Sequence, residues 1–197
     1  MLHVLVIMAA IASQGDVQIQ DVTLKTIFDF ASAPQGQVWN IISDGVMGGL
    51  SQSIFDIDDD NTAVFSGRVS LENNGGFASV RTAPRDYQLG GYSGIILRVK
   101  GDGSTYSFRL RTDANFDGIS YQKNFKTEKD LWIEIRLPFD EFVPTYRGRI
   151  IRSVPPLSPD KIQQMGFLIG NKQKGLFKLN IDWIKAFRSE EKKDEDH

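Results

Sequence analysis

Residues 106–112 read YSFRLRT, and apolar and polar side chains alternate along the segment. Because successive side chains of a β-strand point to opposite faces of a sheet, one face is apolar and the other carries Arg109 and Arg111. Residues 131–137, LWIEIRL, repeat the pattern, and residues 176–187 do so again. This period of two is typical of antiparallel sheets that bury one face.

Strand-length segments recur along the chain, with little helical periodicity between them. A strong turn signal, NNGG at residues 73–76, separates two of them. One short helix is expected, with Ser158 as N-cap, Pro159 in its first turn and an end near Gln164. About nine or ten short strands in one domain favour an all-β fold, a β-sandwich of jelly-roll type. We expect strands near residues 23–30, 62–71, 77–81, 94–100, 106–112, 119–125, 132–137, 165–169 and 176–187.

The length of 197 residues suits a single domain, which we place at residues 20–187. Residues 1–12, MLHVLVIMAAIA, have the length of a signal-peptide core and end in a small-x-small sequence, although no Lys or Arg precedes them. The alternative is a buried N-terminal strand, and the run is too short to span a bilayer. The location is therefore left between secreted or periplasmic and peripheral to a membrane. Residues 188–197 are a charged run, expected as a disordered tail.

Composition excludes several classes of function. The net charge of −2 gives no electrostatic case for a nucleic-acid partner. The chain has no cysteine, and its two histidines, His3 and His197, lie at its ends, so the commonest general base and metal ligand are missing from the domain. No nucleophile elbow or phosphate-binding loop is present, and the spacing of Glu72 and Glu134 does not single them out as a glycosidase pair. We expect neither an enzyme nor a cofactor.

Residues 39–53, WNIISDGVMGGLSQS, contain the most conspicuous loop. Asp44 beside Gly45 is a turn signal, because the carboxylate can accept hydrogen bonds from backbone N–H groups nearby. Closely spaced glycines also let a backbone approach another surface. The loop is either a contact edge that presents Met47 to a partner or a tight connection packed on its own sandwich.

Arginines gather on predicted strands. Arg109 and Arg111 share a polar face, and we expect Arg136 nearby, with Trp132 and Glu134 completing an aromatic-lined platform. Arginine suits planar, bidentate recognition of carboxylates or phosphates. The alternative is a ladder of cross-strand Arg–Glu pairs on a solvated face.

Two acidic clusters lie beside predicted strands. Asp113, Asn115 and Asp117 match the first half of a calcium-binding loop, D-x-N-x-D-G, but the twelfth position is Asn124 instead of Glu and the flanks are strands. A hairpin loop explains this segment as well, so the calcium site is a weak candidate. Residues 56–61 are interpreted as a solvated hairpin turn.

Several further motifs run in order along nearly the whole chain. They include SDGVMGGLSQS at 43–53, FSGRVSLENNGGFASVR at 65–81, SYQKNF at 120–125, MGFLI at 165–169 and IDWI at 181–184. With YSFRLRT, they resemble the complex I intermediate-associated protein 30 (CIA30) family, which carries an NADH:ubiquinone oxidoreductase intermediate-associated domain. The resemblance implies a galactose-binding-like sandwich, similar to carbohydrate-binding modules. It also implies a non-enzymatic assembly factor, chaperone-like, that binds subunits of a membrane complex.

The expected partner is therefore a protein client, and the alternative is a glycan on which Trp132 or Tyr121 stacks. Binding residues are expected on the loop edge and the polar sheet face. They are Asp44, Met47, Ser51, Asn74, Phe77, Arg81, Arg109, Arg111, Tyr121, Trp132 and Arg147.

Overall fold

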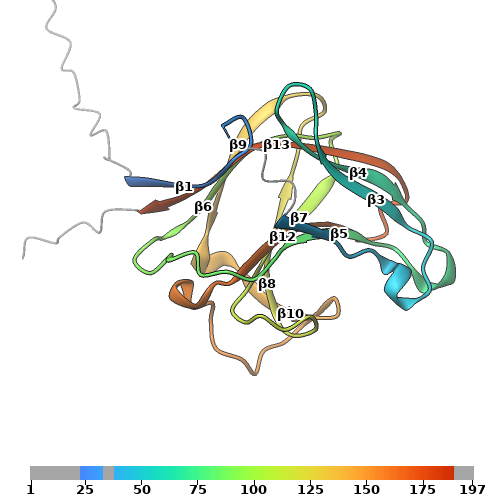
Figure 1. The fold of residues 1–197 in the computed structure, drawn as a ribbon. Helices are drawn as coiled ribbons and strands as arrows, with labels where there is room; N and C mark the ends of the chain where they lie inside the picture. The colour runs from blue at the N-terminus through green and yellow to red at the C-terminus, as the bar shows by residue number, and fades with distance from the viewer. Residues whose placement is uncertain (1–22, 33–37, 189–197) are drawn as a thin grey trace, which may run out of the picture.

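The computed structural model describes residues 23–32 and 38–188, which form two antiparallel sheets packed face to face (Figure 1). One sheet has six strands, with β1 paired to β13 beside the path β3-β4-β13-β6-β9; the other has seven, in the order β11-β10-β8-β7-β12-β5-β2. This arrangement confirms the predicted all-β sandwich. The six-stranded sheet contains β1 (Thr23–Asp29), β3 (Gln52–Ile57), β4 (Ala63–Val69), β6 (Gly94–Lys100), β9 (Trp132–Pro138) and β13 (Gly175–Arg188). The seven-stranded sheet contains β2 (Trp39–Ile41), β5 (Ala78–Thr82), β7 (Thr105–Arg111), β8 (Ser120–Lys126), β10 (Val143–Tyr146), β11 (Arg149–Ile150) and β12 (Gln164–Ile169).

The 14-residue strand β13 organises the six-stranded sheet. Its first half pairs with β4, its second half pairs with β1, and β6 lies along its other edge. Thr23 pairs with Arg188, and Figure 1 shows the start of β1 beside the end of β13. The structure thus continues the strand through Arg188, where the charged tail was expected to begin.

The core lies between the two sheets. Tyr106, Phe108 and Leu110 of β7 are fully buried, as the alternation in YSFRLRT predicts. Trp39 of β2 stacks on Phe55 of β3 with ring centroids 4.9 Å apart, and this contact joins one sheet to the other. Aromatic pairs in such geometry add about 0.5–1.5 kcal/mol beyond the area they bury.

Three local predictions require correction. The helix expected from Ser158 to Gln164 is a single 3-10 turn, η5 (Pro159–Lys161), because Gln164 already begins β12. Residues 73–76 do not close a hairpin: η3 (Glu72–Asn74) carries the chain from β4 in one sheet to β5 in the other. The passage after β9, where no strand was expected, contains η4 (Phe139–Glu141), β10 and β11.

The expected leader at residues 1–12 and the tail beyond Arg188 lie outside the described residues. In the part of the chain that the structure describes, no helix is both long and apolar enough to cross a membrane.

Candidate functional site

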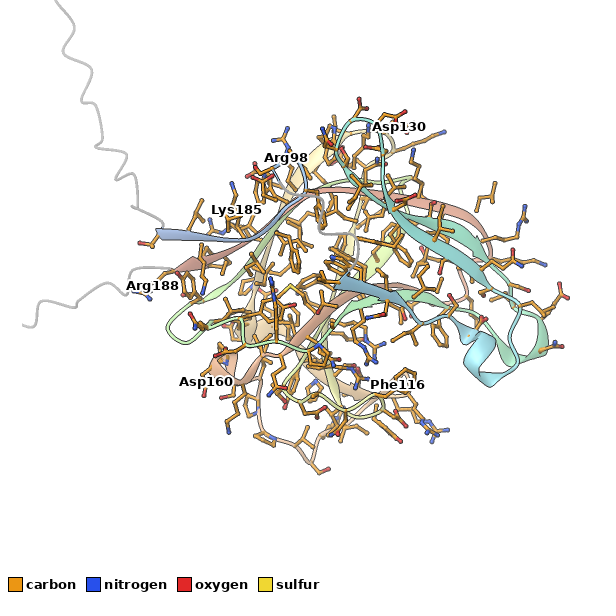
Figure 2. All side chains as sticks on the ribbon, viewed as in Figure 1. Arg98, Phe116, Asp130, Asp160, Lys185 and Arg188 are labelled. Carbon is orange, nitrogen blue, oxygen red and sulfur yellow. The ribbon has the colours of Figure 1, made fainter. Side chains whose placement is uncertain are left out.

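A cleft of about 680 Å³ lies on the outer face of the seven-stranded sheet, opposite the core. Its floor consists of outward-facing residues of β5, β12, β7 and β8. Its rim is formed by residues 116–118 of the loop at residues 113–118, which we call the rim loop, and by Arg147 and Gly148. A volume of this size falls in the range of ligand-binding clefts. Figure 2 shows Phe116, at this rim, on the opposite side of the molecule from Arg98 and Lys185 of the six-stranded sheet.

Strand register brings three arginines together on the cleft floor. Gly166 of β12 pairs with Arg81 of β5 on one side and with Arg109 of β7 on the other. Arg111, two residues further along β7, pairs with Gln164. Adjacent strands are about 4.8 Å apart, so the backbones of Arg81 and Arg109 are roughly 10 Å apart. Gly166, which has no side chain, lies between them.

The guanidinium groups of this cleft bond to oxygen atoms of uncharged groups. Arg109 donates from Nε to the hydroxyl of Ser120 at 3.1 Å. Arg81 donates to the carbonyl of Phe116 at 3.1 Å, and Arg111 to the carbonyl of Asn115 at 3.4 Å. Two of the arginines therefore hold the rim loop against the sheet.

Burial and mutual repulsion shift the acid–base equilibria of these arginines. Burial, with added repulsion from Arg111, lowers the pKa of Arg81 to about 10. Burial, with added repulsion from Arg111 and Arg81, lowers the pKa of Arg109 to about 10. Burial also lowers the pKa of Arg111, although Asp113 and Asp117 oppose that shift. The three guanidinium groups thus lie in a partly desolvated space, where their positive charges repel one another.

Tyr146, Arg147 and a contact within the loop also hold the rim loop. Asp117 forms a 2.7 Å ion pair with Arg147 and accepts a hydrogen bond from the Tyr146 hydroxyl at 3.1 Å. Asp113 accepts from the backbone N–H of Asn115 at 2.9 Å. Within residues 23–32 and 38–188, no group of three or more histidine or acidic side chains could hold a metal ion, so the weak calcium candidate at Asp113, Asn115 and Asp117 gains no support.

Asp44 and Ser51, predicted as a contact edge, form a buried clamp instead. The Asp44 carboxylate is fully buried and accepts from Ser51 N at 2.9 Å and Ser51 Oγ at 2.5 Å. It also accepts from the backbone N–H of Gly76 at 2.7 Å and of Phe77 at 3.2 Å. Burial would raise the pKa of Asp44, but these hydrogen bonds outweigh it and the pKa is lowered. The carboxylate therefore ties the start of β3 to the start of β5.

Two glycines make room for this clamp. A Cβ on Gly49 would lie 2.4 Å from the Asp44 carboxyl carbon, and a Cβ on Gly75 would lie 2.6 Å from Asp44 Oδ2. The glycine-rich sequence thus serves the packing of one buried carboxylate, which is the alternative left open from the sequence.

The predicted aromatic platform is wrong. Trp132 and Arg136 lie on β9 of the six-stranded sheet, away from Arg109 and Arg111. Trp132 is flanked by Arg98 and Lys100, whose cationic groups are 5.8 and 5.2 Å from the ring centroid. Alternation assigns each residue to a face of its strand, but it does not say which sheet the strand joins.

Tyr121 does not offer a stacking ring either. It is buried on the inner side of β8, and its hydroxyl donates to the Pro155 carbonyl at 3.0 Å. Phe77 is half-buried and lines the cleft. The side chains of Met47 and Asn74 lie outside the described part of the structure.

The cleft includes residues that the sequence prediction missed. Gly166 interrupts the apolar run of β12, and a glycine inside a strand is a known signal of close backbone approach; a Cβ there would lie 2.3 Å from the Val80 carbonyl oxygen. Gln164 and Phe116 gave no signal of their own, because their place depends on pairing between distant strands.

Comparison with known proteins fixes the family. The sequence model for complex I intermediate-associated protein 30 (CIA30) matches residues 28–181. The chain belongs to the CIA30 family. The mouse protein named complex I intermediate-associated protein 30, mitochondrial, is 27% identical over an alignment of 183 residues, which covers 83% of this chain and 56% of the mouse protein. The Drosophila melanogaster protein of the same name is 23% identical, covering 80% of this chain and 61% of its own length. The chain thus spans little more than half the length of these two relatives.

An uncharacterized protein of Schizosaccharomyces pombe is 31% identical over 172 residues, covering 76% of this chain and 78% of that protein. Among solved structures, the family 11 carbohydrate-binding module of Clostridium thermocellum, in complex with a mixed-linked tetrasaccharide, superposes with a TM-score of 0.64 at 18% identity. The superposition covers 85% of this chain and 97% of the module. This likeness confirms the galactose-binding-like, jelly-roll architecture.

Proposed function

We propose that this member of the CIA30 family is a non-enzymatic assembly factor that binds protein subunits of a membrane complex through the arginine cleft. Membership of the family and the names of its mouse and fly relatives support the assembly role. The properties of the cleft support its assignment as the client-binding site. Its charged floor offers polar contacts, and the half-buried Phe77 offers apolar ones.

The proposed mechanism needs no cofactor and no bond-making step. The domain covers a surface of an unfinished subunit until the next partner displaces it. Rigid strands carry Arg81, Arg109 and Arg111, so little side-chain ordering is required when the client binds. We propose that the protein acts at the periphery of a membrane complex. The relatives' names place those proteins in mitochondria and lend no support to the secretory alternative.

Site-specific crosslinking tests the proposal. A photo-crosslinking residue replaces Phe116, which is 66% exposed at the cleft rim, or in the control replaces Leu176, which is 75% exposed on the six-stranded sheet. Tagged protein is expressed in its source cells, irradiated and recovered from gently solubilised membranes. Crosslinks to membrane-complex subunits from position 116 and not from position 176 support the proposal. Equal crosslinking from both positions would remove the cleft from it, and no captured subunit from either would overturn it.

A glycan-binding role is the second candidate, favoured by the superposition with a carbohydrate-binding module. Sugar rings usually need an exposed aromatic face, and Tyr121 and Trp132 do not supply one in the cleft. Binding to a panel of glycans can be measured by tryptophan fluorescence and calorimetry. If the wild type bound a glycan and Arg81→Gln abolished that binding, the glycan-binding role would replace the first proposal.

A further inference from the structure

The three cleft arginines have charge that nothing nearby neutralises by direct contact. Within the described residues, no carboxylate lies within ion-pair distance of the Arg81, Arg109 or Arg111 guanidinium group, although ion pairs form elsewhere, such as Arg98 with Asp182 at 2.9 Å. Their bonds to a hydroxyl and two carbonyl oxygens use only part of the donor capacity, since a guanidinium has five N–H groups. Donor groups therefore remain for a ligand.

The arrangement also leaves space for that ligand. Gly166 separates Arg81 from Arg109 in one cross-strand row, so no side chain fills the position between the two guanidinium stems. A Cβ there would meet the backbone of β5, so no larger residue fits without movement of the strands. The gap is built into the sheet.

Gln164 supplies an independent sign of a missing partner. Its side chain is 2% exposed and lines the cleft, and its Oε1 is buried without a hydrogen-bond partner among the described residues. A buried amide oxygen without a partner destabilises the folded chain, and a ligand that supplies a hydrogen-bond donor removes this cost. Its neighbour across the strand pair is Arg111, so the unpartnered amide lies in the row next to the gap.

We propose that the cleft binds carboxylate groups of an acidic segment in the client polypeptide. This inference rests on the proposed function, and it names the chemistry of that same site. Arg81 and Arg109 approach a carboxylate placed above Gly166 from two sides, and Arg111 receives a second acidic group one row away. Gln164 Oε1 is an acceptor, so its partner is a backbone N–H of the same polypeptide rather than a carboxylate. Guanidinium groups bind carboxylates through paired, charge-assisted hydrogen bonds, which are shorter and stronger than neutral ones.

Two features favour an acidic peptide over other anions. The rim carries Asp117, Asp113 lies in the same loop, and the whole chain has a net charge of −2. A long polyanion that extends beyond the cleft would therefore be repelled, whereas a short acidic segment can lie within it. An acidic sugar would need a free aromatic face, but Arg81 already lies over the Phe116 ring at 5.3 Å from its centroid. A polypeptide with a few acidic side chains among apolar ones meets neither obstacle.

The direct test measures binding of labelled oligoglutamate to the full chain, with oligoglutamine and oligogalacturonate as comparison probes. We expect oligoglutamate to bind, oligoglutamine not to bind, and Arg109→Gln to weaken oligoglutamate binding about tenfold or more, since a lost charged hydrogen bond has about this effect. Arg81→Gln is the second variant, in case loss of the Ser120 contact unfolds the first. Arg68→Gln is the matched control, because Arg68 is an exposed arginine on β4 of the other sheet.

Each result decides the proposal. Oligoglutamate binding that weakens in both cleft variants and with added salt, but not in Arg68→Gln, supports it. Equal binding of oligoglutamine or oligogalacturonate, equal loss in the control, or no oligoglutamate binding would overturn it. Client crosslinking from position 116 is scored separately, so a captured client without oligoglutamate binding refutes the carboxylate chemistry and leaves the assembly role intact.

Discussion

Replacing Asp44 with Asn separates a structural role from a contact role at the glycine-rich loop. The carboxylate accepts four hydrogen bonds, two from Ser51 and one each from Gly76 and Phe77. An amide has one oxygen, so in either orientation its NH₂ group faces at least one buried donor. Each hydrogen bond to a charged group contributes about 1.5–3 kcal/mol, so losing one or two should lower the free energy of unfolding by about 2–4 kcal/mol.

Urea unfolding at neutral pH, followed by tryptophan fluorescence, gives this free energy. The dependence of the free energy on urea concentration should be the same in the variant and the wild type, which shows that both unfold through comparable transitions. The exposed Asp59→Asn on the β3–β4 turn is the matched control and should change stability by less than about 0.5 kcal/mol. The double variant with Ser51→Ala should show coupling of about 1–2 kcal/mol, because the two side chains share one hydrogen-bond network.

The reasoning is refuted if Asp44→Asn unfolds like the wild type and yet loses client crosslinking. Asp44 would then be a contact residue, as the sequence alone suggested. A loss of stability equal to that of Asp59→Asn would also show that the buried clamp does not stabilise the fold.

Three further outcomes follow from the same contacts. Hydrogen bonds hold the pKa of Asp44 below its ordinary value of 3.8. The contribution of Asp44 to the free energy of unfolding is therefore complete above pH 3.8 and is lost as the pH falls through the lower pKa of the folded state. When the free energy of unfolding is measured against pH, it should fall more steeply below pH 3.8 in the wild type than in Asp44→Asn. Gly49→Ala places a methyl group against the Asp44 carboxyl group and should cost about 1–3 kcal/mol in urea unfolding, and an unchanged midpoint would contradict the packing described. Phe28→Ala removes a fully buried ring and should cost about 3–5 kcal/mol, and a smaller loss in thermal unfolding would show that the core collapses into the space.

The sequence predicted the strands whose side chains alternate clearly, because alternation records burial directly, and it missed β2, β3, β10 and β11. Tyr106, Phe108 and Leu110 had to face a core, and they do. It did not predict sheet membership, which depends on strand pairing at long range. Arg136 and Arg109 both alternate outward, yet one packs over Phe187 at 4.1 Å and the other lines the cleft of the opposite sheet.

The candidate site was predicted in part for the same reason. Arg109 and Arg111 were visible as one face of one strand, whereas Gln164 and Gly166 join them only through the register of β12. The sequence left two alternatives open for the glycine-rich loop, because local spacing is the same for a displayed turn and for one that wraps a buried carboxylate. The deciding contact, Asp44 with Gly76, spans residues far apart in the chain.

The position of β13 has a consequence for biosynthesis. This strand lies between β4 and β6 and also pairs with β1, so before it emerges from the ribosome the six-stranded sheet exists only as two strand pairs, β3–β4 and β6–β9, and the separate strand β1. Closing pairings between distant segments is slow, and unpaired strand edges are prone to aggregate. Until residues 175–188 are available, the edges of β4, β6 and β1 that pair with β13 stay open, and during that interval the nascent domain is itself a substrate for cellular chaperones.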